Sequence, residues 1–294
     1  MTRITTSSLT TNTERNLQAA MTRLATIQNK AGTQKEIGRP SDDPAGTANV
    51  MALRAQQRQN EQFSRNVQDA NGWLSTTDTA MTTATDLLQQ VRDLTVKGAN
   101  DGALSPDGKE AIALELDQLH DALLNAANTQ FMGRLVFAGT SNDSQAVKAV
   151  GGAYEFSGTS GVDRRIGPNS TVRVDANGAE VFGPADDSVF KLVRDIAMEL
   201  RAGTNVASQI VEVDKRLQAV LGAQATIGAN HASVLAADDA LLSDSVSLEA
   251  RRSGIEDIDL GSVILELKTQ EVAYQAALSA ASRTLQPSLM DFLR

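Results

Sequence analysis

The chain has 294 residues, of which 41% are hydrophobic and only 3% aromatic, and its 36 acidic and 27 basic side chains give a formal net charge of -9. Such a chain offers neither a broad cationic face nor a base-stacking platform, so nucleic acid is a poor partner. The absence of cysteine excludes disulfides, thiolate metal sites and a cysteine nucleophile. The apolar content is mostly aliphatic, which favours packed helices.

The first residues, MTRITTSSLTTNTER, contain no apolar run, so we expect no classical secretory signal. No stretch of about 18 apolar residues follows, so we expect no membrane insertion. The chain therefore either stays in the cytoplasm or leaves the cell by another route. Downstream, an apolar stripe at helical spacing predicts a first helix and comprises Leu17, Met21, Leu24 and Ala31.

Prolines divide the next part of the chain, because a helix interior seldom tolerates them. The proline-free intervals 45–105 and 185–286 therefore predict long helices. Asp43 before Pro44 and Ser105 before Pro106 are typical of helix starts. Two apolar stripes support helices after these starts. They comprise Val67, Ala70, Leu74, Thr77, Met81, Ala84, Leu88 and Val91, then Ile112, Leu116, Leu119, Leu123 and Ala126.

The pattern changes between residues 138 and 185, where eight of the 21 glycines lie. Short alternating runs, such as Tyr154 with Phe156 and Val172 with Val174, are separated by glycine-rich turns. This alternation predicts small hairpins.

Two further stripes follow, at the alternating three-and-four spacing of packed helices. The first comprises Ile210, Val213, Leu217, Val220, Gln224, Ile227, His231, Val234, Asp238, Leu241, Ser245 and Leu248. The second comprises Leu260, Ile264, Leu267, Glu271, Tyr274, Leu278, Ala281 and Leu285. Both stripes require helices as partners.

The predicted fold class is mainly α, a long antiparallel helical rod built from both chain ends with a small β-rich inserted domain. The predicted parts are terminal helices at 1–44 and 255–294, a helical rod domain at 45–137 and 185–254, and the insertion at 138–184. An intramolecular antiparallel coiled coil explains the terminal stripes without any partner. Polar interruptions within residues 1–40 favour the alternative, in which neighbouring molecules cover part of the stripes.

Few residues suggest chemistry. His120 and His231 lack the spacing of a ligand pair, and we interpret both as packing or surface residues. The acidic pairs at 42–43 and 186–187 adjoin expected helix starts, where carboxylates cap backbone N–H groups. Phosphate-binding and nucleophile motifs are absent from the sequence. We therefore predict no catalytic, cofactor-binding or metal-binding residues, and no enzyme.

Four segments, in the right order, resemble motifs of the bacterial flagellin and hook-associated protein family. Residues 38–46 (GRPSDDPAG) resemble the turn after the first terminal helix, and residues 63–72 resemble the SRNxxDG segment with two residues of extra spacing. Residues 253–259 (SGIEDID) resemble the IEDxD turn before the last helix, and residues 289–294 (LMDFLR) resemble the carboxyl end. The chain is identified on these motifs as a member of the family.

Two branches of the family compete. Residues 129–133 (TQFMG) resemble the flagellin segment TQFNG, with Met132 in place of Asn. Residues 135–139 (LVFAG), the PSDDP segment and the MDFLR ending are more similar to hook-associated protein 3, the hook-filament junction branch. The resemblance favours the junction branch and leaves flagellin as the alternative. Outside the family, the alternative is a cytoplasmic coiled-coil scaffold.

The resemblance implies a secreted structural subunit of the extracellular bacterial flagellum, needed for motility and exported unfolded through the type III apparatus. The implied partners are flagellin, the other hook-associated junction protein, copies of the chain in a ring, and a flagellar export chaperone. It also implies that the terminal helices stay disordered until assembly and then make the inter-subunit contacts, at about 25 cal/mol per Å² of apolar surface buried. The implied assembly residues are Leu17, Met21, Leu24, Leu260, Ile264, Leu267, Tyr274, Leu278 and Leu285.

Overall fold

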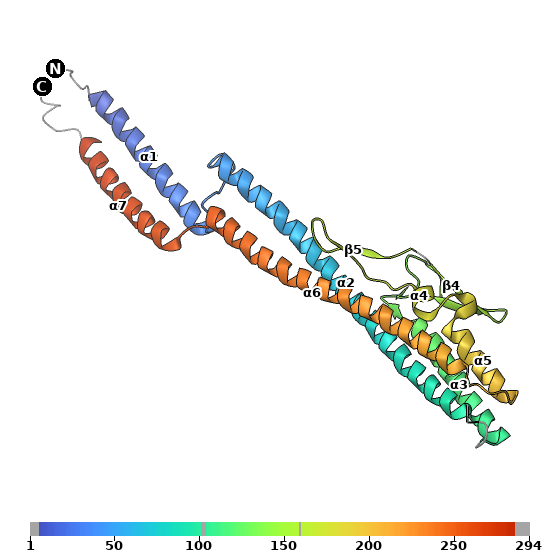
Figure 1. Ribbon diagram of the computed structural model, residues 1–294. Helices are drawn as coiled ribbons and strands as arrows, with labels where there is room; N and C mark the ends of the chain where they lie inside the picture. The colour runs from blue at the N-terminus through green and yellow to red at the C-terminus, as the bar shows by residue number, and fades with distance from the viewer. Residues whose placement is uncertain (1–5, 101–103, 159, 286–294) are drawn as a thin grey trace, which may run out of the picture. The chain divides into compact units, whose positions relative to one another are not determined.

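The computed structural model describes residues 6–100, 104–158 and 160–285 and is mainly helical (Figure 1). The helices are α1 (Thr6–Thr33), α2 (Pro44–Gly98), α3 (Pro106–Ala127), α4 (Gly178–Phe182), α5 (Val189–Arg201), α6 (Gln209–Glu256) and α7 (Leu260–Leu285). The strands are β1 (Gln130–Phe131), β2 (Arg134–Leu135), β3 (Val147–Val150), β4 (Ala153–Phe156), β5 (Asp163–Arg165) and β6 (Thr171–Arg173). The predicted fold class, mainly α with a small β-rich insertion, is confirmed.

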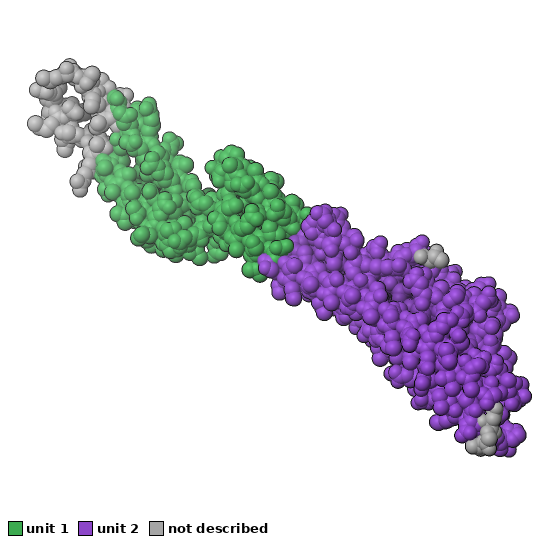
Figure 2. Space-filling view, viewed as in Figure 1, with its two compact units in different colours: residues 1–59, 244–294 green, residues 60–243 purple. Residues whose placement is uncertain are grey.

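The chain divides into two compact units, shown in different colours in Figure 2. Unit 1 consists of residues 1–59 and 244–294, so it joins both ends of the chain, and unit 2 consists of residues 60–243. In unit 1, α1 lies beside α7 (Figure 1). This division differs from the three predicted parts, whose boundaries stay a prediction.

Local chemistry sets where two of the helices begin. The N–H of Gly46 donates to Oδ1 of Asp43 at 2.9 Å, and α2 begins at Pro44. In the same way the N–H of Gly108 donates to Oγ of Ser105 at 3.1 Å, and α3 begins at Pro106. In both cases the cap satisfies a backbone donor that the first turn leaves without an intrahelical acceptor.

The predicted stripes of α2 and α3 are buried throughout, from Val67 to Val91 and from Ile112 to Ala126. Along α6 the deepest positions recur every seven residues and are Val213, Val220, Ile227, Val234 and Leu241. The interval 185–286 is not one helix, however. α5 ends at Arg201 and Gly203 adopts a left-handed backbone with φ of 76°, which breaks the helix before α6 begins.

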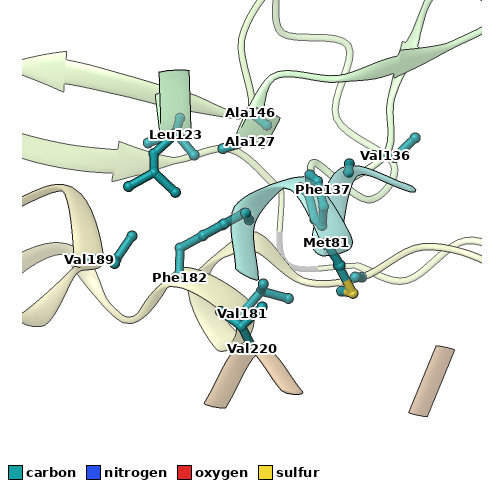
Figure 3. Packing of buried hydrophobic residues seen from close by; sticks show 14 of the residues in the cluster. Met81, Leu123, Ala127, Val136, Phe137, Ala146, Val181, Phe182, Val189 and Val220 are labelled. Carbon is teal, nitrogen blue, oxygen red and sulfur yellow. The ribbon is translucent and has the colours of Figure 1, made fainter. Parts of the chain in front are cut away.

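The predicted hairpins form in the insertion, where β3 pairs with β4 and β5 pairs with β6, both antiparallel. Aromatic rings of this region meet α5: the ring centroids of Phe182 and Phe190 are 5.3 Å apart, and those of Tyr154 and Phe190 are 5.4 Å apart. Figure 3 shows Phe182 in this core together with Val181 and Val220. The few aromatic side chains are therefore concentrated where the insertion packs on the helices of unit 2.

The turn between β1 and β2 contains Met132, whose φ is 49°. A side chain with a Cβ seldom adopts this left-handed backbone, and asparagine tolerates it better than methionine does. Since the Met132 side chain is 84% exposed, it gains no packing in return.

We expect Met132→Asn to raise the free energy of unfolding of unit 2 by about 0.5–1 kcal/mol, because asparagine fits the turn with less strain. Urea unfolding followed by fluorescence measures this, since the single tryptophan, Trp73, is buried in unit 2. The matched control is Met198→Asn, an exposed position inside α5 where asparagine should stabilise nothing. A lower urea midpoint for Met132→Asn would contradict the expectation.

Candidate assembly surfaces

The groups that could suggest chemistry have structural partners. His120 Nε2 lies 2.5 Å from the hydroxyl of Tyr154, and His231 Nε2 lies 2.6 Å from Oδ1 of Asn71. A hydrogen bond from Arg216 lowers the pKa of Asp187, which fixes this carboxylate against α6. Within the described part of the chain, no cluster of three or more acidic or histidine side chains could hold a metal ion, and no helix is long and apolar enough to cross a membrane.

The α1–α7 pair of unit 1 has a narrow apolar seam. On α1 the seam is deepest at Ile27, with Leu17 and Leu24 half-buried on the same face. On α7 it is deepest at Val263 and Ala281. The α7 seam residues recur at steps of four and three and are Val263, Leu267, Gln270, Tyr274, Ala277 and Ala281.

Helix α7 also presents large apolar side chains outside this seam. Ile264 is 52% exposed, and other exposed side chains extend the apolar surface around the helix. These are Leu260, Leu265, Val272 and Leu278. A helix that is apolar on more than one face is typical of one that becomes buried on several sides.

The predicted assembly residues thus fall into two groups. Leu17, Leu24, Leu267 and Tyr274 are half-buried in unit 1, whereas Met21, Leu260, Ile264 and Leu278 are exposed. Leu285 ends α7, but its side chain lies outside those that the structure describes.

Sequence reasoning missed Val263 as part of the seam. The predicted stripe began at Leu260 and joined positions from two faces of α7. The spacing from Val263 to Ala281 carries the correct signal, but Gln270 and Ala277 occupy places where larger apolar residues would have made it visible.

The connectors at the ends of α1 and α6 form a clasp around Glu256. The N–H of Glu36 donates to the carbonyl of Glu256 at 2.7 Å, and the N–H of Ile258 donates to the carbonyl of Gln34 at 3.3 Å. The Glu256 side chain is buried and accepts from Lys35, from Arg54 Nη2 at 2.6 Å and from Arg252 Nη1 at 3.2 Å. Three segments of unit 1 therefore meet at a single carboxylate.

The electrostatics of the clasp favour the ionised acid. Burial acts to raise the pKa of Glu256, but the hydrogen bond from Lys35 and the positive charges of Arg54, Lys35 and Arg252 outweigh it. The pKa of Glu256 is consequently lowered, and the carboxylate stays charged near neutral pH.

Comparisons with known proteins match the chain to flagellar proteins. The model of the bacterial flagellin N-terminal helical region matches residues 4–142. Flagellar hook-associated protein 3 of Salmonella typhimurium is 26% identical, covering 83% of this chain and 85% of that protein. Flagellin of Bacillus subtilis is 27% identical, covering 90% and 91% respectively.

Solved structures share the fold. A putative flagellar hook-associated protein from Vibrio parahaemolyticus is 21% identical with a TM-score of 0.68, covering 74% of this chain and all of that one. FlgL from Xanthomonas campestris is 18% identical with a TM-score of 0.62, and the match covers 68% of this chain and 99% of that one.

Proposed function

We propose that this chain, which belongs to the bacterial flagellin and hook-associated protein family, is the structural subunit of the hook-filament junction. In this role it connects the other hook-associated junction protein to flagellin as a ring of copies. The observation that carries the proposal is the apolar face of α7 outside its seam, which includes Ile264, because exposed apolar patches of this kind mark surfaces that bind other molecules.

The assembly residues belong to this proposal. Met21, Leu260, Ile264 and Leu278 would meet neighbouring subunits directly, since they are exposed in the single chain. Leu17, Leu24, Leu267 and Tyr274 would act through the α1–α7 seam, and Leu285 would extend the apolar stripe at the end of α7. Because the seam is narrow and partly polar, the terminal helices would gain much of their order from assembly.

The remaining features of the proposal follow from the family. The subunit would be secreted unfolded through the flagellar type III apparatus with the help of an export chaperone, and would act outside the cell without enzymatic activity. The absence of cysteine suits this route, because no disulfide has to form or be broken during passage.

Flagellin is the second candidate, since a flagellin is as similar in sequence as a hook-associated protein. The PSDDP and LVFAG segments favour the junction role. Purified full-length chain separates the two: long filaments grown from this chain alone would support flagellin, and short or absent polymers would support the junction subunit.

Deleting the gene should leave cells that build hooks but release flagellin monomer into the medium, because flagellin would lack the subunit on which it polymerises. Immunoblots of the medium and electron microscopy of the hooks measure the two results. Restoring the gene should return flagellin to filaments. A deletion strain with normal filaments would contradict the proposal.

A further inference from the structure

A hollow of about 300 Å³ opens beside the clasp in unit 1. Apolar side chains form one part of its lining and cations form another. The apolar group is Ile37, Pro40, Val50 and Met51, and the cations are Lys35, Arg39 and Arg54. We call this hollow the clasp pocket.

The lining of the clasp pocket carries more positive than negative charge, and part of the positive charge faces the solvent. The one acid in its lining, Glu256, is buried and already accepts from Lys35 and Arg54. Among the described residues, the Arg39 guanidinium has no carboxylate partner, and the Met51 side chain is 65% exposed. A complementary group would therefore present both apolar atoms and carboxylates.

One face of α6 in unit 2 has these properties. Leu235 and Leu242 lie one heptad apart and are 49% and 68% exposed, which is unusual for leucines on a helix whose other face is packed. Asp238 and Asp239 lie between them, are exposed, and have no cation partner within the described part of the chain. Spacings of three, four and seven residues place these side chains on one surface, which we call the acidic leucine face.

We propose that the acidic leucine face of one copy of this chain docks into the clasp pocket of a second copy. Asp238 and Asp239 would pair with Arg39 and Arg54, while the two leucines would cover the apolar lining. Each surface lies within one compact unit, so both are defined by contacts internal to that unit. Opposite charges across an interface set its register and steer association, and apolar contacts at its centre supply affinity.

The two surfaces are different, so the contact is heterologous. A heterologous contact leaves one free surface of each kind on every pair of copies, and repetition produces a ring or a helical array. This inference rests on the proposed ring of copies and names the surfaces that would form it.

Cysteine cross-linking tests the contact directly, because the chain contains no native cysteine. Full-length Arg39→Cys protein is mixed with full-length Asp239→Cys protein and oxidised at high concentration. We expect the mixed disulfide to form at least 10-fold faster than in a control mixture of Arg58→Cys with Asp239→Cys, since Arg58 is exposed in unit 1 but does not line the clasp pocket. Equal rates in the two mixtures would overturn the proposal.

Charge reversal supplies an independent measurement. Arg39→Glu and Asp239→Arg should each weaken self-association of the full chain at least 10-fold in sedimentation velocity, and the chain carrying both should recover most of it. If neither reversal weakens association, or the double variant associates no better than the single variants, the proposal fails.

The experiments distinguish a failure of the docking contact from a failure of the proposed junction function. A deletion strain rescued by the wild-type chain and equally by both reversal variants would reject the docking contact and keep the junction function. Cross-linking as expected, with no flagellar defect in the deletion strain, would reject the junction function and keep the docking contact.

Discussion

Ile264→Asp is expected to abolish incorporation of the chain into the flagellum while leaving the free chain folded. Ile264 is 52% exposed outside the α1–α7 seam, so a carboxylate there remains hydrated in the single chain. On assembly, covering the isoleucine would contribute about 1 kcal/mol per copy, whereas burying an unpaired carboxylate costs several kcal/mol. Adding the variant gene to the deletion strain and measuring flagellin release checks the result.

The structure separates this variant from the neighbouring Leu267→Asp. Leu267 is half-buried in the seam, so its replacement should also loosen the α1–α7 pair. Gln28→Asp, on the exposed polar side of α1, is the matched control and should retain incorporation. Normal swimming by cells that carry Ile264→Asp would show that this face of α7 is not covered by neighbours.

Glu256→Gln is expected to lower the free energy of unfolding of unit 1 by about 1–3 kcal/mol at pH 7. Glutamine keeps the shape of the side chain but removes the charge that holds Lys35, Arg54 and Arg252. The effect stays below the full cost of a broken buried pair, because the side chains of Lys35 and Arg54 are nearly half exposed and remain partly hydrated. Hydrogen exchange at the amides of Glu36 and Ile258 reports the opening of the clasp.

The pH dependence has a definite sign. The pKa of Glu256 is lower in the folded chain than the ordinary glutamate value of about 4.3. The contribution of Glu256 to the free energy of unfolding is therefore present above about pH 4.3 and is lost as the pH falls through the folded pKa. In the wild type, the protection of the Glu36 and Ile258 amides against hydrogen exchange should therefore hold from pH 7 to about 5 and decline below about 4.

The Glu256→Gln variant should lack this decline of amide protection at acid pH. The control variant Glu36→Gln, which changes an exposed acid of the same connector, should keep it. An acid decline of the same size in the Glu256→Gln variant would assign the effect to other groups.

The buried residues of the helices in unit 2 could mostly be predicted from the sequence. In α2 and α3 the three-and-four spacing identified buried residues, and in α6 it identified Val213, Val220 and Leu241. Asp238 and Ser245 of the same predicted stripe are exposed. The apolar stripes of α2 and α3 are buried throughout, so periodicity determines which of these residues face inward, whereas α6 also carries the exposed Leu235 and Leu242 outside its buried stripe. The hairpins of the insertion were predictable for a similar reason, because glycine-rich turns and alternating residues are local signals.

The seam of α7 and the clasp at Glu256 were decided only by the tertiary structure. α7 is apolar on more than one side, so its sequence alone allows several seams, and the position of α1 selects the one that runs from Val263 to Ala281. Lys35, Arg54 and Glu256 are far apart in the chain, and no local pattern reports that three cations share one buried carboxylate. Local periodicity therefore determined the helices and their packed faces, while contacts between distant segments decided which apolar and charged groups remain available to another molecule.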